Sequence, residues 1–399
     1  MKTTTRDDGE SIALFEPLIG SVDTASRAKL NDLALTLAEK SAAFSASLPA
    51  AISNSLGDIV RIADCHYSNL IEGHNIQPID IERAVHDGYS DAVKAHDLQL
   101  EARAHVIVQK WIDDGSLAAA PFSTDAIGEV HKRFRELLPS ELLSIEDGKG
   151  DEKSLVGPGA MKTRHVNVGR HVAISCDLAQ RSLSSMAESY TSAGRIDRIL
   201  IAACGYHRFF WVHPFLHGDG RVARLVSYAA LRSEISTRGL WSVARGLAGR
   251  QREYATHIRS SNGPRQGSRD GRGLLSADAL SDFAKFFLET CIEQVDFMSG
   301  LMEPHKLRDR MLTWMHEEVR AGTLPPRVDA VLTAILYRGE LDRAEIVALT
   351  GTSERSAERL SAALLRSGVV QTERSRTSLK LAFPVALARR FLTGLFPHD

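Results

Sequence analysis

The stretch His213-Pro-Phe-Leu-His-Gly-Asp-Gly-Arg-Val-Ala-Arg-Leu225 combines a histidine, two glycines around one polar residue and two arginines three positions apart. Gly218 and Gly220 can adopt backbone angles that are closed to other residues, so successive N–H groups can converge on an anion. We expect a helix to begin at about Arg221, and its positive N-terminal end would add to that attraction. The stretch therefore predicts a phosphate-binding loop that leads into a helix.

Three side chains of this stretch carry chemistry. Arg221 and Arg224 lie one turn apart on the expected helix, so both guanidinium groups can bond the oxygens of a phosphate. His213 lies just upstream, where a neutral imidazole can accept a proton from an attacking hydroxyl. The Gly-x-Gly pattern alone is weak evidence, because a glycine-rich turn with solvated arginines has the same composition.

The complete string is more restrictive, and it resembles the signature of the Fic family (filamentation induced by cAMP), His-Pro-Phe-x-acidic-Gly-Asn-Gly-Arg-x-x-Arg. The resemblance implies transfer of AMP from ATP to a Ser, Thr or Tyr hydroxyl of a protein. It implies that His213 is the general base, that Phe215 anchors the loop and that Arg221 and Arg224 hold the β- and γ-phosphates. The matching positions are His213, Pro214, Phe215, Gly218, Gly220, Arg221 and Arg224.

Two positions depart from the family pattern. His217 stands where an aspartate or glutamate normally binds Mg²⁺, and Asp219 stands where asparagine is usual. Mg²⁺ prefers oxygen ligands, whereas Mn²⁺ and other transition metals accept an imidazole nitrogen. Two interpretations stay open. Either Asp219, alone or with His217, binds a divalent metal (Mg²⁺ or Mn²⁺), or metal affinity has been lost.

A second motif, Ser68-Asn-Leu-Ile-Glu-Gly73, ends a predicted helix. Glu72 is one turn beyond Ser68, and Gly73 is a typical helix stop, so a solvated glutamate at a helix end is the simplest interpretation. Next to the first motif, however, Ser-x-x-x-Glu-Gly resembles the inhibitory helix of Fic proteins. The resemblance implies that Glu72 pairs with Arg224 and prevents productive seating of the γ-phosphate. It also allows Glu72 to position a water that removes AMP.

The segment 162–174 predicts a β-hairpin, because apolar and polar residues alternate on both sides of Gly169. In the Fic family a hairpin before the signature forms a flap that holds the target by strand addition. A structural ribbon with its arginines in solvent has the same pattern, and this alternative stays open. The flap candidates are Arg164, His165, Val166, Asn167 and Val168.

Tyr254 lies on a helix predicted over residues 240–260. Because an aromatic residue near this point often lines the adenine pocket of Fic proteins, the resemblance makes Tyr254 a candidate for nucleotide binding. A tyrosine of the hydrophobic core is the alternative. The nucleotide- and phosphate-binding candidates are thus Gly218, Asp219, Gly220, Arg221, Arg224 and Tyr254.

Residues 323–327, Thr-Leu-Pro-Pro-Arg, mark a boundary, because paired prolines end a helix. The elements expected beyond them are helix, helix, turn, helix and hairpin, which is typical of a winged helix-turn-helix. Interleaved glutamates weaken the basic patch, and such domains also serve dimerisation or protein docking, so the partner stays open. The DNA-binding candidates are Arg355 and Arg359 on the third helix and Arg374 and Arg376 in the wing.

The composition is that of a soluble globular protein, with 399 residues, 43% hydrophobic, 25% charged and a net charge of −1. Nucleic acid or membrane binding would therefore need a local patch. Four scattered cysteines indicate reduced, buried thiols in a cytoplasmic protein, and no apolar run is long enough for a membrane span.

We expect a mostly α fold, a Fic helical core with a β-hairpin flap, followed by an α+β winged helix-turn-helix domain. Expected partners are ATP, a protein target that includes another copy of the chain, a homodimer partner and DNA. The alternative function is a nucleotide-responsive DNA-binding regulator with a catalytically impaired core. Expected domains are 1–100 (helical, with the inhibitory helix), 101–300 (catalytic core), 301–325 (connecting helix and linker) and 326–399 (winged helix). Helices are predicted over 23–48, 59–71, 80–111, 178–190, 197–211, 240–260 and 276–298.

Overall fold

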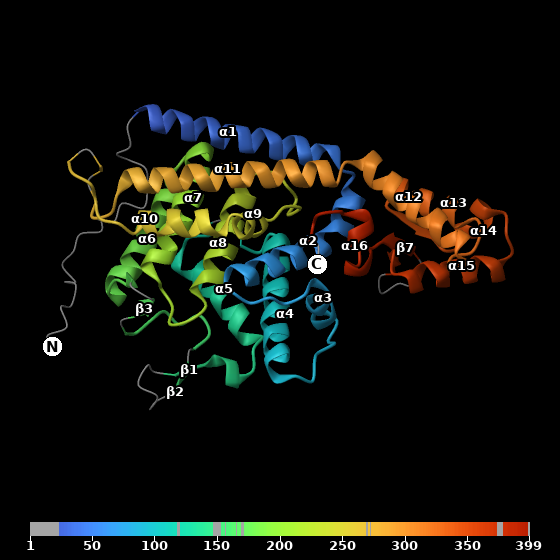
Figure 1. Ribbon diagram of the computed structural model, residues 1–399, viewed down its shortest axis with the longest axis horizontal. Helices are drawn as coiled ribbons and strands as arrows, with labels where there is room; N and C mark the ends of the chain where they lie inside the picture. Colours follow the sequence, from blue (N-terminus) through green and yellow to red (C-terminus); the bar gives the residue numbers. More distant parts are fainter. Residues whose placement is uncertain are drawn as a thin grey trace.

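The computed structural model describes residues 24–117, 120–146, 153–155, 157–164, 166–168, 171–268, 270–271, 273–372 and 378–397. Helices dominate this part of the chain, as predicted (Figure 1). The long helices α1 (Thr24–Ser47) and α11 (Ala277–Leu301) lie side by side along one edge of the molecule, and both contact α7 (Arg195–Val212). Within the described ranges, no helix has the length and apolar character that a bilayer crossing requires.

Helix α7 is the centre of the core. It is buried on almost every face, and it packs against α8 (Asp219–Glu234), α6 (Cys176–Ser192) and α11. A helix that is buried on almost every face has little solvated surface, so its neighbours fix its position closely. The loop between α7 and α8, which holds the first motif, therefore starts from a helix held on most sides.

The N-terminal helices differ from the prediction in two places. Helix α2 (Ala50–Ile71) begins directly after Pro49, nine residues before the expected start, because Ile52 and Leu56 extend its buried face. The single helix expected over 80–111 is two helices, α3 (Pro78–Val85) and α4 (Val93–Asp113). Asp87, with φ 62°, reverses the chain between them.

One other predicted helix also breaks, and a further helix follows the one predicted over 276–298. The helix expected over 240–260 is divided at Arg250 into α9 (Val243–Gly249) and α10 (Gln251–Ser261). Helix α11 ends at Leu301, and Pro304 then starts a new helix, α12 (Pro304–Arg320), which the Glu303 carboxylate caps.

Short strands are the elements that periodicity failed to find. Ahead of the predicted hairpin lies an antiparallel pair, β1 (Ser144–Glu146) and β2 (Lys153–Leu155), each too short to show alternation. The predicted hairpin is present as β3 (Asn167–Val168) paired with β4 (His171–Val172). Before both strand pairs, α5 (Thr124–Glu136) starts at an N-cap, where the Ser123 hydroxyl accepts a hydrogen bond from the Ala126 N–H.

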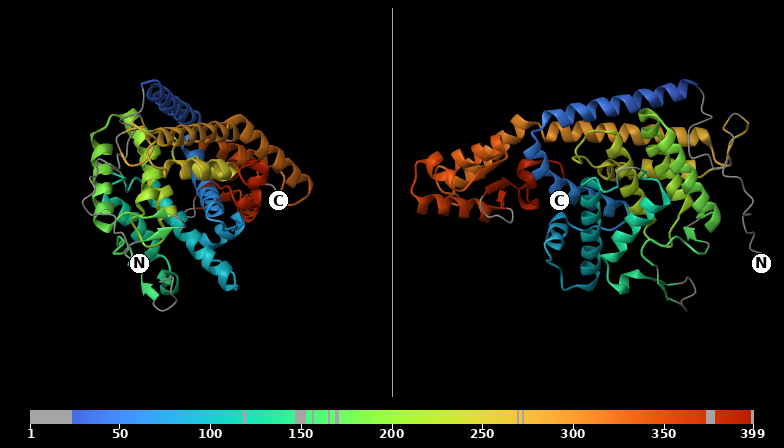
Figure 2. Two further views of the ribbon diagram at one scale, coloured as in Figure 1. Left: turned by 60° about the vertical axis from the view of Figure 1, so that its left-hand side comes forward. Right: turned by 180° about the vertical axis from the view of Figure 1, so that it is seen from behind.

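The C-terminal region extends from one end of the core (Figure 2) and has the predicted order of helices and hairpin, with two additions. The additional strand β5 completes a three-stranded antiparallel sheet in the order β5-β7-β6, and the additional helix α16 returns the chain to the core. The elements are α13 (Val328–Arg338), β5 (Glu340–Asp342), α14 (Glu345–Thr350), α15 (Glu354–Ser367), β6 (Val370–Gln371), β7 (Ser378–Leu381) and α16 (Val385–Phe391).

All four cysteines are free. Cys65, Cys204 and Cys291 are buried as expected, whereas Cys176, at the start of α6, is only partly buried. Burial raises the pKa of the Cys65 and Cys204 thiols, so both are protonated at neutral pH. They act as small apolar residues of the core.

Candidate functional site

The first motif forms a tight loop between α7 and α8. His213 ends α7 in the left-handed conformation (φ 50°, ψ 67°), and its N–H donates to the Phe209 carbonyl at 3.0 Å. Gly218, with φ 90°, turns the chain into α8, which begins at Asp219 rather than at Arg221 as expected. The first N–H groups of a helix have no partner inside it. The Gly-Asp-Gly segment therefore lies where a helix offers its anion-binding end.

His131 on α5 fixes the conformation of this loop through one ring contact and two hydrogen bonds. Its imidazole stacks on the buried Phe215 ring, with the ring centroids 3.9 Å apart and an interplanar angle of 6°. Nδ1 accepts from the Gly159 N–H at 3.0 Å, and Nε2 donates to the His217 carbonyl at 3.2 Å. One partner can only donate and the other can only accept, so the imidazole is neutral with a fixed tautomer. Burial lowers the pKa of His131 to about 4, which agrees with a structural role.

Lys162, just before the hairpin, holds the loop from another side. Its N–H donates to the Pro214 carbonyl at 2.8 Å, and its ammonium donates to the Val212 carbonyl at 2.9 Å. One residue thus bonds both carbonyls that flank His213. Burial lowers the pKa of Lys162 to about 8. Sequence reasoning missed this residue, because both of its partners are about fifty positions away in the chain.

The environment of His213 suits a general base. Burial lowers the pKa of His213 to about 4, and the nearby cationic Lys162 contributes in the same direction. The imidazole is therefore neutral at pH 7 and able to accept a proton. Its Nε2 lies 3.2 Å from Oδ2 of Asp219.

Asp219 is turned into the loop. Its side chain is fully buried, and Oδ1 accepts a hydrogen bond from the Phe215 N–H at 3.0 Å. Burial raises the pKa of Asp219 to about 7. A protonated aspartic acid offers one acceptor and one donor, the same pair that the asparagine amide of the family pattern offers. Asp219 therefore closes the loop from inside, as an asparagine would.

The residues present do not fit the divalent metal that the resemblance implied. The Asp219 carboxyl faces Phe215 and His213, and His217 offers a nitrogen from the surface, which Mg²⁺ does not prefer. Over the residues described, no group of three or more His, Cys, Asp and Glu side chains could hold a metal ion. A requirement for Mg²⁺ or Mn²⁺ stays a prediction.

The two arginines of the motif already have carboxylate partners. Arg221 donates to Oε2 of Glu101, on α4, at 2.7 Å. Arg224 is more deeply buried and meets the second motif, since Nε donates to the Ser68 hydroxyl at 2.7 Å and Nη2 to Oε1 of Glu72 at 2.5 Å. The structure thus places Ser68, Glu72 and Arg224 together, as the resemblance implied. Glu101 was not predicted, because nothing in the sequence near it marks it as part of a motif.

Glu72 lies at the end of α2, directly over the start of α8. Burial alone would raise the pKa of its carboxyl, but Arg224 lowers the pKa below its ordinary value, so the group is ionised at pH 7. A Cβ atom added to Gly220 would overlap Oε1 of Glu72. Gly73, with φ 85°, ends the helix immediately afterwards. The carboxylate thus occupies space beside the anion-binding end of α8.

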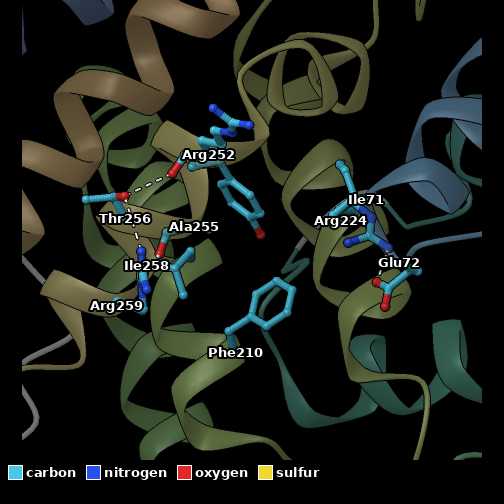
Figure 3. Close-up of a pocket in the computed structure, with 10 residues that line it drawn as sticks. Ile71, Glu72, Phe210, Arg224, Arg252, Ala255, Thr256, Ile258 and Arg259 are labelled. Carbon is cyan, nitrogen blue, oxygen red and sulfur yellow. Dashed lines mark hydrogen bonds and ion pairs between the residues drawn. The ribbon is translucent and has the colours of Figure 1, made fainter. Parts of the chain in front are cut away.

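A pocket of about 690 Å³ opens beside this ion pair (Figure 3). Figure 3 shows Glu72 and Arg224 on one side of it, and Arg252 and Arg259 of α10 on the other. The predicted Tyr254 lines the pocket and is also part of the core, since its hydroxyl lies 2.8 Å from that of the buried Tyr206. The complete lining is Ile71, Glu72, Phe210, Arg224, Arg252, Tyr254, Ala255, Thr256, Ile258 and Arg259.

The hairpin reaches the site through β4. His171 lies next to the end of α7, where its Nε2 donates to the Trp211 carbonyl at 2.7 Å. The Val166 carbonyl accepts from the Ala173 N–H at 3.0 Å, which extends the pairing of β3 with β4. Of the other flap candidates, Arg164 is described and precedes the hairpin, whereas His165 lies outside the described residues.

The DNA-binding candidates are far from this site in the chain. Arg355 and Arg359 are exposed on α15. Arg374 and Arg376 lie outside the described residues.

Comparisons with known proteins agree with this architecture. Residues 121–231 match the model of the Fic/DOC family. A Fic family protein from Desulfovibrio desulfuricans G20 is similar in structure, with a TM-score of 0.52 and 15% identity over 92% of this chain and 98% of that chain. For a Fic domain containing signalling protein from Bacteroides thetaiotaomicron VPI-5482, the TM-score is 0.50 and the identity 14%, over 67% and 95% of the two chains. Fic-1 (aa134–508) from C. elegans gives a TM-score of 0.51 and 15% identity, over 69% and 73%.

No curated protein matches the chain. The buried helix pair with a histidine and glycine loop between its members defines an α-helical protein with the Fic fold. Residues 121–231 of the chain form a Fic/DOC family domain.

Proposed function

We propose that this protein transfers AMP from ATP to a Ser, Thr or Tyr hydroxyl of a protein, and that Glu72 inhibits the transfer. The observation that carries the proposal is the Glu72–Arg224 ion pair, which lies between a pocket of about 690 Å³ and the anion-binding start of α8. Fic domains generally transfer AMP or another nucleoside monophosphate to proteins, so the family supports this class of reaction.

The chemical step follows from the loop. The neutral His213 imidazole accepts the proton of the target hydroxyl, and the hydroxyl oxygen attacks the α-phosphorus of ATP. The bond from the α-phosphorus to the bridging oxygen breaks, and pyrophosphate leaves. The N–H groups at the start of α8, around Gly218 and Gly220, stabilise the charge on the α-phosphate oxygens.

The pocket supplies a place for the adenosine part of ATP. Phe210, Tyr254 and Ile258 give it an apolar lining that suits a nucleobase, and the two arginines of α10 lie at its edge. Because Arg224 lines the same pocket, a nucleotide bound there would have its phosphates at the motif helix.

Inhibition follows from how Arg224 is bonded. Nε of Arg224 donates to Ser68, and Nη2 donates to Glu72. Among the described residues, the buried Nη1 is the nitrogen of this guanidinium that has no hydrogen-bond partner. A γ-phosphate that needs this guanidinium must displace the carboxylate and also meets its negative charge. The bond to Glu72 is therefore incompatible with full phosphate binding by Arg224.

Transfer of labelled AMP tests the proposal. The assay compares three proteins, wild type, Glu72→Gly and the double variant Glu72→Gly/His213→Ala. Each is assayed in the presence of Mg²⁺ and of Mn²⁺, with a protein acceptor that can be the chain itself. We expect strong labelling by Glu72→Gly, weak labelling by wild type and none by the double variant. No labelling in any lane, with ATP binding intact, would contradict transfer from ATP.

A second function is favoured by α15. Arg355, Arg359 and Arg366 are exposed and share one face of this helix, and none has an ion-pair partner among the described residues. Unpaired arginines on the third helix of a winged helix-turn-helix suit the phosphates of duplex DNA. A chain with an impaired core would then act as a nucleotide-responsive DNA-binding regulator.

Salt-dependent binding to a random DNA duplex tests this second function. Arg355→Gln/Arg359→Gln should weaken binding and reduce the salt slope by about two, one for each lost phosphate contact. Arg338→Gln is the matched control, because Arg338 is already paired with Glu345 at 2.7 Å. Equal binding by both variants would exclude α15 as the DNA-contacting element.

A further inference from the structure

Helix α2 is held from two sides near its end. On one side, Ser68 and Glu72 bond Arg224 of α8. On another side, Tyr67 and its neighbour His66 contact the last described part of the chain, residues 385–397, which we name the C-terminal segment. Tyr67 and Ser68 are consecutive in α2, and the first contacts the C-terminal segment whereas the second contacts α8.

The contacts of the C-terminal segment with α2 are specific. The Tyr67 hydroxyl donates to the Leu395 carbonyl at 2.9 Å, and both residues are buried. The Phe396 ring packs edge-on against the His66 imidazole, with the centroids 6.1 Å apart. Phe396 and Val385 also pack against the small apolar cluster that α2 forms with α3 and α4. A bonded carbonyl and an aromatic contact fix both the distance and the rotation of the helix.

Arg245 on α9 fixes the same segment to the core. Its Nη2 donates to the Gly394 carbonyl at 2.9 Å, and its Nη1 donates to Oε1 of Gln294 at 3.0 Å. Its guanidinium lies 3.5 Å from the centroid of the Phe297 ring, and 5.9 Å from that of Tyr67. The C-terminal segment therefore sits between α2 and α11, with Arg245 in contact with both sides.

The joint between the C-terminal domain and α2 is not completely packed. A pocket of about 420 Å³ lies there, lined by residues of α2, α3 and α4 on one side and by β6 and Pro384 on the other. At the edge of this joint, the Val385 N–H donates to Oε1 of Glu82 at 2.9 Å. Interfaces between domains of this kind open more readily than a continuous core.

We propose that the C-terminal segment holds α2 in its inhibitory position, so that undocking of this segment releases Glu72 from Arg224. The inference rests on the proposed function only in that Glu72 inhibits transfer. A small shift or rotation of the helix end moves Ser68 and Glu72 together, and hydrogen bonds weaken steeply as distance and angle change. Water reaches the Glu72 carboxylate, since a third of its side chain is exposed, so it can be solvated once it leaves Arg224. The coupling is reciprocal, so release of Glu72 also loosens the C-terminal segment.

Two variants of the full chain test the inference. Phe396→Ala removes the contact with His66, and Tyr67→Phe removes only the hydrogen bond to Leu395 and keeps the ring. The matched control is Arg390→Gln, which breaks the 2.8 Å ion pair of α16 with Glu317 on α12 and leaves α2 untouched. Two quantities are measured, hydrogen exchange of the amides of residues 66–73 and transfer of labelled AMP.

We expect both variants to speed hydrogen exchange over residues 66–73. We also expect both to raise AMP transfer by about fivefold or more, which is the low end of the coupling between two sites. Their transfer should stay below that of Glu72→Gly. The control should match wild type in both measurements. Unchanged exchange over residues 66–73 overturns the inference. Faster exchange also overturns it if Glu72→Gly is active but transfer by the two variants stays at the wild-type level. If Glu72→Gly is itself inactive, the proposed transferase has failed, and exchange alone then decides whether the segment holds the helix.

Discussion

The catalytic loop and the inhibitory helix of the proposed function are held by different kinds of contact. The loop is fixed by buried hydrogen bonds to backbone groups, from Lys162, His131 and Asp219. The inhibitory helix is fixed to the motif helix through Arg224, and its carboxylate partner is one-third exposed. Buried bonds between fixed groups persist, whereas a partly solvated ion pair exchanges at small cost for another anion. Under the proposed function, this difference means a fixed catalytic geometry and an inhibitor that can be displaced.

The largest effect is expected where the loop is fixed. Lys162→Met removes the ammonium that bonds the Val212 carbonyl beside His213, and misplaced catalytic groups can cost about 100-fold in rate. We expect a loss of this size in the Glu72→Gly background, with ATP binding retained. Lys132→Met is the control, because Lys132 is exposed and has only a weak pair with Glu136. Equal rates for both lysine variants would show that the loop does not depend on Lys162.

A smaller effect is expected where the loop and the inhibitor touch. Gly220→Ala places a methyl group against Oε1 of Glu72 and must push the carboxylate aside. We expect transfer about 10-fold above wild type, a coupling within the usual range for residues in contact. The double variant Glu72→Gly/Gly220→Ala measures the effect of the methyl group on the loop alone. A simple addition of the two single effects would mean that Gly220 and Glu72 act independently.

The pH dependence distinguishes the loop from the inhibitor further. The pKa of His213 is lowered to about 4, so its imidazole is neutral above that pH and is protonated as the pH falls through it. Protonation of Asp219, whose pKa is raised to about 7, should not lower the rate, because the protonated acid offers the same donor and acceptor as asparagine. The rate of Glu72→Gly should therefore show no loss between pH 7 and pH 5 and should fall near pH 4. A free histidine would lose activity near 6.5. The pH profile of single-turnover transfer measures this, and a midpoint near 6.5 would contradict burial of His213.

The smallest effect concerns stability. Ser68→Ala removes the hydroxyl that accepts from Nε of Arg224, in a fully buried position. We expect the free energy of unfolding to fall by about 1–2 kcal/mol, because a buried charged donor loses its partner. Denaturant titration measures the change. Ser192→Ala, at the exposed end of α6, is the control and should leave the free energy of unfolding unchanged within about 0.5 kcal/mol.

Local patterns predicted the site residues that form motifs. Spacing along one helix was enough to relate Arg221 to Arg224 and Ser68 to Glu72, and the resemblance joined the two pairs. Glu101 and Lys162 escaped, because each acts on partners that lie roughly 50 to 120 positions away, and only the folded chain joins them. The inward position of Asp219 also escaped, since burial of a carboxyl has no signature in a sequence.

The long helices of the fold were predictable from the sequence, and the short elements were not. Buried helices such as α7 follow from apolar periodicity, and the caps at Ser123 and Ser276 mark true starts. The split between α3 and α4 depends on one residue with a positive φ, and strands of two or three residues carry too little pattern. Helix α16 was missed because its apolar face is completed by α3 and α12, far earlier in the chain.

Glu72 belongs to the same polypeptide as the arginine that it bonds, so dilution does not weaken the contact. An attached partner behaves as if it were present at an effective concentration in the millimolar range. ATP has to compete with that value however little protein a cell contains. The proposed inhibition is therefore insensitive to the amount of protein, and it is relieved by competing ATP or by events that change the geometry of the chain itself.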